Sequence, residues 1–421
     1  MTKDPSNGSV RLTDRLSIGV LTRIFPRDLV DEIVNEAGRR EKRSRLLPAH
    51  VVVYFVLGLG LFFGESYDEV MRRLVGGLQF MRNWPSSWAV PTSSAMSQAR
   101  QRLGEEPLRE LFRRVARPIA GPGDVNAWFA GRRVMAIDGV VLDAPDTPAN
   151  EEEFGYTTGG RGSSVFPHVR IVGLGECATH ALVGAVIGRS SQGERTLAYD
   201  LVTDLEPDML VLADRGFYSF RLWTAVLETG ADLLFRVSTK NVFPVIEVLA
   251  DGSYTSVLVQ ADNQSAIRKG AARREKREAG ASNKWLLQNG KLCRVIEYTI
   301  EGSEDKEVYR LVTSILDPED APSSELAALY SERWEFELTL DEIEIHQLGH
   351  GRVLRSKSPE MVKQEVWGIL LTHYAIRHLI HEAADYAAVD DDRISFLRAL
   401  RVVRRQMTGR TNFSPSPDSQ R

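Results

Sequence analysis

Residues 133–143 read Arg-Val-Met-Ala-Ile-Asp-Gly-Val-Val-Leu-Asp, an apolar run rich in β-branched side chains that is interrupted by Asp138 and Gly139. Two further runs of this kind follow at 165–173 and 181–187, and glycines and polar residues separate all three. Short β-branched runs between turn residues predict strands, and three in close succession predict an antiparallel arrangement.

After these runs the sequence alternates between helical and strand-like segments. We expect helices at 194–205 and 217–229, and buried strands at 209–213 and 232–237. Three paired strands followed by alternating helices and strands predict a mixed α/β sheet. A second β-like stretch, from 240 to 316, is expected to form an insertion before the next long helix.

The remaining segments predict helices. The region 11–130 is punctuated by prolines and contains the apolar run Val51 to Phe63. That run is shorter than the about 20 residues of a membrane span, so we expect a buried helix and no membrane partner. The polar segment 1–10 lacks the apolar core of a signal peptide. An amphipathic helix is expected at 359–384.

Composition excludes several classes of protein. The chain has 421 residues, 43% hydrophobic and 26% charged, which is typical of a globular protein with two or three domains. Its two cysteines cannot form a disulfide framework or a four-cysteine zinc site, so we expect a reduced cytoplasmic compartment.

The net charge of −4 gives no sign of nucleic-acid binding, so the distribution of charge matters more. Basic residues cluster at 268–277 and 398–405. Arg100 and Arg102, in a helix expected after residue 95, could face a phosphate backbone. Each basic cluster can equally be a solvated surface.

Two aspartates stand where apolar strands are expected to end. Asp138 ends the apolar stretch Val134 to Ile137, and Asp214 follows the strand expected at 209–213; the ends of such strands are where α/β sheets place ligands. With a glutamate from a helix they could bind two metal ions, one activating an attacking oxygen and the other stabilising the leaving oxygen of a phosphodiester. Carboxylates suit Mg²⁺ or Mn²⁺. For Asp214, capping of the helix at 217–229 stays open as an alternative.

The octet Tyr330-Ser-Glu-Arg-Trp-Glu-Phe-Glu337 supplies such a glutamate. Tyr330, Arg333 and Glu337 stand at i, i+3 and i+7, on one face of a helix. A hydroxyl, a guanidinium and a carboxylate in one row could grip a phosphate beside a metal ion. The alternative is an ordinary ion pair between Arg333 and Glu337 on a solvated helix.

Together these residues resemble the DDE transposases of bacterial insertion sequences, in the insertion sequence 4 group marked by Tyr-x2-Arg-x3-Glu-x6-Lys. The resemblance extends from about residue 20 to 405 and rests on the motifs at 137–139, 212–217 and 330–337. It implies a ribonuclease H-like mixed α/β sheet with a β-rich insertion and an N-terminal helical domain. The implied catalytic and metal-binding triad, with Mg²⁺ or Mn²⁺, is Asp138, Asp214 and Glu337.

The resemblance also implies an activity. Such an enzyme binds the terminal inverted repeats of double-stranded DNA, cleaves a strand by metal-dependent hydrolysis, and joins the 3′-hydroxyl to target DNA. It implies a homodimer that pairs two transposon ends, located in the bacterial cytoplasm at the nucleoid. Two alternatives stay open: a decayed or domesticated DNA-binding protein of the same fold, and a metal-dependent nuclease unrelated to transposition.

Several DNA-binding residues follow from the resemblance. Tyr330 and Arg333 would hold a phosphate of the transposon end near a flipped base. Tyr309 is the candidate on which that base stacks, although a cross-strand aromatic in the insertion would look the same. Arg215, within the second motif, is a further candidate.

One position departs from the family pattern. Six residues after Glu337 the group has a lysine, whereas this chain has Glu344, whose charge would repel a phosphate. Lys357 or Lys363 could substitute for the missing lysine, or the activity could be weakened; both readings stay open.

The predicted organisation has five parts. They are an N-terminal helical DNA-binding domain at 1–130, the first part of the core at 131–239, the β-rich insertion at 240–318, the second part of the core with C-terminal helices at 319–405, and a disordered tail at 406–421.

Overall fold

The computed structural model describes residues 19–41, 47–76, 90–159, 162–260, 288, 290–299 and 308–406. They fall into two compact units. Unit 1 comprises the described residues of Met1–Arg117, Asp143–Glu153 and Asp341–Arg421, and unit 2 those of Pro118–Leu142 and Phe154–Leu340. Within the described ranges, no helix is both long enough and apolar enough to cross a membrane.

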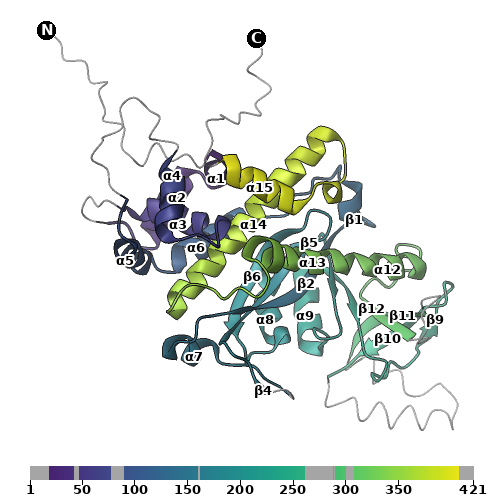
Figure 1. Cartoon of the computed structure of the whole chain (residues 1–421). Helices are drawn as coiled ribbons and strands as arrows, with labels where there is room; N and C mark the ends of the chain where they lie inside the picture. The colour runs from purple at the N-terminus through teal and green to yellow at the C-terminus, as the bar shows by residue number, and fades with distance from the viewer. Residues whose placement is uncertain are drawn as a thin grey trace, which may run out of the picture. The chain divides into compact units, whose positions relative to one another are not determined.

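Unit 2 is built on a ten-stranded sheet with the order β6-β5-β2-β7-β8-β12-β11-β10-β9, with β1 paired to β2 (Figure 1). The strands of its first half are β1 (Trp128–Phe129), β2 (Arg132–Asp143), β5 (His168–Glu176), β6 (Ala181–Arg189), β7 (Met209–Ala213) and β8 (Asp232–Arg236). β5 and β6 are antiparallel, whereas β2, β7 and β8 run parallel to one another. The three strands expected first in the chain are therefore neighbours, and the predicted mixed sheet is present.

Helices α8 (Glu194–Asp200) and α9 (Phe220–Thr229) pack beside each other against this sheet (Figure 1). The helix expected at 194–205 is shorter because a 3₁₀ turn, Val202–Asp204, follows it. The helix expected from 217 begins at Phe220, because the side chain of Ser219 accepts a hydrogen bond from the backbone N–H of Leu222 and caps it.

The β-like stretch predicted at 240–316 extends the same sheet instead of forming a separate one. It contributes β9 (Glu247–Val248), β10 (Tyr254–Leu258), β11 (Lys291–Thr299) and β12 (Val308–Thr313). β12 pairs antiparallel with β8, with Val312 opposite Phe235. The basic cluster at 268–277 lies outside the described residues.

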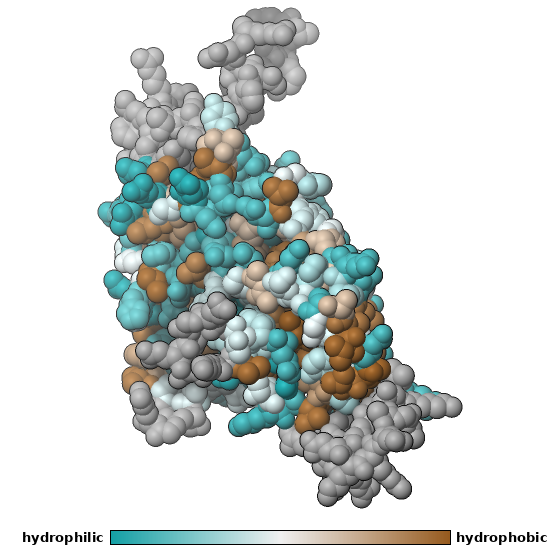
Figure 2. Space-filling model, turned by 90° about the vertical axis from the view of Figure 1, so that its right-hand side faces the viewer, coloured by the Kyte–Doolittle hydropathy of each residue, from teal (hydrophilic) through white to brown (hydrophobic). Residues whose placement is uncertain are grey.

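The insertion keeps some large hydrophobic side chains at its surface: Val245, Val248, Leu292 and Val308 are each at least 40% exposed. On the face shown in Figure 2, hydrophilic residues dominate and hydrophobic side chains gather at the lower right.

Unit 1 is helical. It contains α1 (Gly19–Ile24), α2 (Arg27–Glu36), α3 (Ala49–Leu61), α4 (Tyr67–Gly76), α5 (Ser93–Leu103), α6 (Glu106–Val115), most of α7 (Pro148–Phe154), a π-helix (Glu342–Leu348), α14 (Pro359–Ala387) and α15 (Phe396–Gln406). The expected apolar helix is α3, whose described side chains are almost all buried. It crosses α14 closely, since a Cβ on Gly60 would lie 2.6 Å from the carbonyl oxygen of Gly368. Because other helices surround it, α14 is buried on most of its circumference instead of being amphipathic.

The position of Arg100 differs from the one predicted from the sequence. Its side chain is fully buried in unit 1, and its Nε donates to Gln364 Oε1 at 2.7 Å. Its Nη2 donates to the carbonyl of Met361 at 2.9 Å. The expectation that Arg100 faces a phosphate backbone is therefore wrong, because this face of α5 packs against α14. Arg102 is exposed.

Candidate active site

The parallel strands of unit 2 bring the two predicted aspartates together. The last residue pair between β2 and β7 is Ile137 with Ala213, so Asp138 and Asp214 occupy the next position on neighbouring strands. Asp214 follows the end of β7 as expected. Asp138 does not end its strand, because β2 continues to Asp143 and is longer than its neighbour.

Asp214 is held by its own turn. Its Oδ1 accepts a hydrogen bond of 2.7 Å from the backbone N–H of Gly216. The cap of α9 is Ser219, so the alternative that Asp214 caps this helix is wrong. The carboxylate is partly exposed at the edge of the sheet.

The octet supplies the third carboxylate from a helix. The predicted continuous helix is divided into α12 (Ser323–Leu329), a 3₁₀ turn (Tyr330–Glu332) and α13 (Arg333–Asp341). Arg333 Nη1 lies 3.0 Å from Asp138 Oδ2 and 2.7 Å from Glu337 Oε1. The Arg333–Glu337 ion pair of the simpler interpretation is thus present, but it includes Asp138 from β2.

A close contact with the sheet fixes the position of α13. Phe336 is fully buried, and a Cβ on Gly175 of β5 would lie 2.1 Å from its ring. Only glycine can therefore stand at 175 while Phe336 keeps this place. Because Glu337 follows Phe336 directly, this contact sets the height of the carboxylate above the sheet.

Two carboxylates of the site, those of Asp138 and Glu337, share the guanidinium of Arg333. The pKa of Asp138 is raised to about 6; burial is the largest cause, the charges of Asp214 and Glu337 also raise it, and the Gly139 N–H and Arg333 lower it. The three carboxylates form a set of hard oxygen donors suited to a divalent cation.

Arg333 occupies the position that a cation would take between Asp138 and Glu337. Although all three acids belong to the described residues, their carboxylate oxygens do not all lie within 4.8 Å of one another. Asp138, Asp214 and Glu337 would hold a divalent metal ion only in an arrangement in which their carboxylates lie closer together than they do here. The three carboxylates are suitable ligands for a divalent metal ion. In the structure described here, Arg333 instead balances the charges of Asp138 and Glu337.

Tyr330 lies beside this cluster. Its hydroxyl, 3.4 Å from the carbonyl oxygen of Ala213, donates to the end of β7, and the guanidinium of Arg333 lies 5.9 Å from its ring centre. Burial raises its pKa to about 12, with Asp214 adding to the effect and Arg333 opposing it. Tyr330 is therefore a neutral hydrogen-bond donor at ordinary pH.

Arg236 is a charged residue of this edge that the sequence analysis missed. β7 and β8 pair up to Ala213 and Phe235, so Arg236 occupies the position next to Asp214. It could have been found by the same rule as Asp214, since it ends the third parallel strand. Its guanidinium lies 4.4 Å from the ring centre of Tyr309.

Tyr309 also has an aromatic partner. It stands directly opposite Tyr298 in the β11–β12 ladder, with ring centres 5.5 Å apart and a 24° angle between the ring planes. This is the cross-strand pair that the sequence left open, so the stacking of a base on Tyr309 stays a prediction.

The other predicted DNA contacts belong to different units. Arg215 is exposed directly after Asp214 in unit 2, whereas Lys357 is exposed in unit 1. Lys363, the other possible substitute, pairs with Glu153. Glu344 lies in the π-helix of unit 1, so the α-helical spacing that would have continued the row from Glu337 does not hold there.

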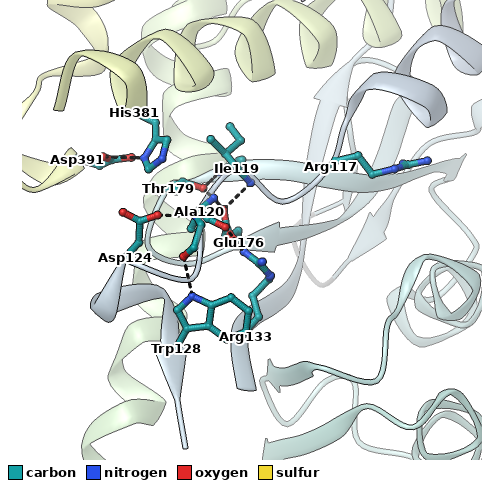
Figure 3. Close-up of polar contacts among 12 residues, drawn as sticks. Arg117, Ile119, Ala120, Asp124, Trp128, Arg133, Glu176, Thr179, His381 and Asp391 are labelled. Atoms are coloured by element: carbon teal, nitrogen blue, oxygen red, sulfur yellow. Dashed lines mark hydrogen bonds and ion pairs between the residues drawn. The ribbon is translucent and has the colours of Figure 1, made fainter. Parts of the chain in front are cut away.

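A second charged cluster of unit 2 lies around Glu176, the last residue of β5 (Figure 3). Glu176 is fully buried, and its Oε2 accepts hydrogen bonds of 3.0 Å from the backbone N–H groups of both Ile119 and Ala120. The Thr179 hydroxyl donates to the same oxygen, and Arg133 of β2 pairs with Oε1. Each oxygen of this carboxylate therefore has a donor.

Comparison with known families agrees with the geometry. The transposase DDE domain family matches residues 129–374, which is more than half of the chain, and the N-terminal family of insertion element 4 transposases matches residues 15–113. The chain belongs to the DDE transposases of the insertion sequence 4 group.

Individual relatives of this transposase include the Escherichia coli K12 protein described as transposase InsG for insertion sequence element IS4. It is 29% identical over 392 residues, which cover 92% of this chain and 82% of InsG. The putative transposase InsZ of the same strain is 26% identical over 209 residues, covering 49% of this chain and 67% of InsZ.

Among solved structures, the piggyBac transposase in a synaptic complex with hairpin DNA is similar in fold. The TM-score is 0.50 at 11% sequence identity, with 94% of this chain and 80% of that chain covered. The expected ribonuclease H-like mixed α/β fold is thereby confirmed.

Proposed function

We propose that this transposase binds the terminal inverted repeats of its own mobile element and performs cut-and-paste transposition with Mg²⁺ or Mn²⁺. The catalytic residues would be Asp138, Asp214 and Glu337. The observation that supports the proposal is that Asp138 and Asp214 occupy matching positions on the parallel strands β2 and β7, and that Arg333 of α13 contacts both Asp138 and Glu337.

The three carboxylates would hold the metal ions. Bound there, the metal would supply activation of the attacking oxygen and stabilisation of the leaving oxygen. Water and then the 3′-hydroxyl of the cut strand would act as nucleophiles, so the reaction needs no covalent bond between protein and DNA.

Arg333 and Tyr330 would bind the phosphate of the transposon end. A guanidinium forms strong charge-assisted hydrogen bonds to phosphate, and Arg333 already lies among the carboxylates that would face the scissile bond. Tyr330 would add a neutral O–H donor. Arg215, exposed beside Asp214, would extend the contact to neighbouring phosphates.

The proposed partners are double-stranded DNA, as transposon ends and as target, and a second copy of the chain. A homodimer would hold two ends together during transfer, in the bacterial cytoplasm at the nucleoid. The exposed Lys357 of unit 1 would be a further DNA contact.

The experiment compares wild type with Asp138→Asn on duplexes carrying the inverted repeats that flank the gene. Removing a metal ligand should cost several kcal/mol of transition-state stabilisation, so strand cleavage should fall by roughly a thousandfold or more. Binding of the transposon end and binding of Mn²⁺, the latter measured by calorimetry, are followed separately from cleavage. In Asp138→Asn, binding of the end should persist and binding of Mn²⁺ should weaken. Asp208→Asn, exposed just before β7, is the matched control. Cleavage by Asp138→Asn at the wild-type rate would contradict the proposal.

Glu344 favours a second candidate function, a decayed DNA-binding protein of this family without strand transfer. The same assay separates the two when Glu344→Lys is included. Strong cleavage by wild type excludes the decayed protein, whereas cleavage that appears only in Glu344→Lys supports it.

A further inference from the structure

Helix α15 of unit 1 has an unusual charge composition. Its eleven residues, Phe396–Gln406, include four arginines and no acidic residue, although the whole chain has a net charge of −4. Arg398, Arg401 and Arg405 are exposed and stand at i, i+3 and i+7, so they form one row about 10 Å long on the helix surface. We call these three residues the α15 face.

The opposite side of α15 fixes the helix within unit 1. Phe396, Leu400 and Val403 are buried, and α15 packs against α14 and the π-helix (Figure 1). The fourth arginine, Arg404, points to this side, and its Nε donates to the carbonyl of Leu61 at 2.6 Å. The arginines of the α15 face are therefore not needed to hold the helix in place.

Helix α6 of the same unit shows how arginines are usually accommodated. Its Arg109 and Arg113 pair with Glu106 and Glu110 of the same helix. Arg114 pairs with Glu110 and with two glutamates of α2. On α15, by contrast, neither Arg398 nor Arg401 has a carboxylate partner in the part of the chain that the structure describes.

A row of exposed guanidiniums, in which Arg398 and Arg401 have no carboxylate partner among the described residues, is complementary to a polyanion with closely spaced charges. Duplex DNA carries one negative charge per about 1.7 Å of its axis, so a row of about 10 Å faces several phosphates. Arginine suits this partner because its planar group binds phosphate through two hydrogen bonds. A contact of this kind would be electrostatic and independent of sequence.

We propose that the α15 face binds the backbone of double-stranded DNA as a second contact region, separate from the carboxylate site. The inference rests on the proposed function, since a transposase must hold more DNA than the scissile phosphate. The α15 face lies on unit 1, whereas the three carboxylates lie on unit 2.

The test measures how the affinity of the full chain for a random-sequence duplex of about four helical turns depends on salt, with EDTA present to prevent cleavage. Each phosphate contact contributes about 0.9 to the slope of log K against log salt. Arg398→Ala combined with Arg401→Ala should therefore reduce the magnitude of the slope by about 1.8, and at about 0.1 M salt should weaken binding roughly tenfold to a hundredfold.

Two control variants make the result specific. Arg109→Ala with Arg113→Ala removes the same number of arginines from α6, where both are paired, and should leave the slope unchanged. Arg398→Lys with Arg401→Lys keeps the charge and should keep most of the slope. A wild-type slope in the α15 alanine variant, or an equal loss in the α6 variant, would overturn the proposal.

The outcomes also separate this inference from the proposed function. If Asp138→Asn abolishes cleavage while the α15 variant binds like wild type, the inference alone fails. If the wild type binds neither the random duplex nor the transposon ends, both fail. Cleavage at saturating DNA should be equal in wild type and the α15 variant, because the α15 face does not touch the reacting phosphate.

Discussion

Strand β2 carries a charged residue of each of two contrasting clusters, only five positions apart. Arg133 belongs to the cluster of Glu176, and Asp138 belongs to the cluster of Arg333. At Glu176 the acid is fully buried, the arginine is mostly buried, and both carboxylate oxygens have donors. At Asp138 two carboxylates, those of Asp138 and Glu337, share the guanidinium of Arg333 and remain partly exposed.

The difference separates charge that maintains the fold from charge that is available for chemistry. A buried ion pair is tolerated when its hydrogen bonds are complete, as they are around Glu176. Carboxylates that raise the pKa of their neighbour, as around Asp138, leave a negative excess that a cation would relieve. Mutations in the two clusters should therefore affect different properties.

Glu176→Gln should have the largest effect on stability. It leaves Arg133 mostly buried without its counter-charge, which typically costs about 3–5 kcal/mol. Chemical denaturation would measure the free energy of unfolding, and cleavage per folded molecule should stay close to that of wild type. Glu194→Gln is the control. It removes the carboxylate that pairs with Arg170, and because this carboxylate is more exposed than that of Glu176, the loss should cost about 1 kcal/mol of stability or less. If Glu176→Gln is as stable as its control, the cluster does not have the structural role assigned to it.

Gly175→Ala should connect the two clusters, because Gly175 precedes Glu176 and touches Phe336. The added Cβ cannot fit 2.1 Å from the buried ring, so α13 must shift. Overpacking of this kind costs about 1–3 kcal/mol. A displacement of about 1 Å at Glu337 should slow cleavage roughly a hundredfold.

The control for this prediction is a compensating change. Gly175→Ala combined with Phe336→Leu shortens the side chain that clashes and should recover part of both stability and cleavage. If Gly175→Ala alone cleaves at the wild-type rate, the glycine contact does not set the position of Glu337.

The sequence located the residues whose signals are local. Asp138 and Asp214 follow short apolar runs, and Arg333 and Glu337 are four residues apart, so their neighbours in the chain suffice to place them. Arg100 was misplaced because the partner that buries it, Gln364, is 264 residues away. Glu176 went unnoticed for the same reason, since all of its donors except Thr179 come from 119–133. The π-helix at Glu342–Leu348 has no local sequence signal, and it interrupts the spacing expected for Glu344.

Substitution of Tyr309 should have the smallest effect of the three on stability. It tests whether this residue contributes to the fold, to DNA binding, or to both. If Tyr309 only pairs with Tyr298, Tyr309→Ala should cost about 0.2–1 kcal/mol of stability and leave DNA affinity unchanged. If a base stacks on it, the same change should weaken binding of the transposon end by about 1–3 kcal/mol.

Tyr298→Ala is the matched control, because it removes the same cross-strand pair but leaves the Tyr309 ring and its contact with Arg236 in place. We expect Tyr309→Ala to reduce the affinity for the transposon end more than Tyr298→Ala does. The reason is that Tyr309 contacts Arg236, which lies on the strand position next to Asp214. If the two substitutions reduce end affinity equally, Tyr309 has a structural role, as Glu176 does, and does not bind a base.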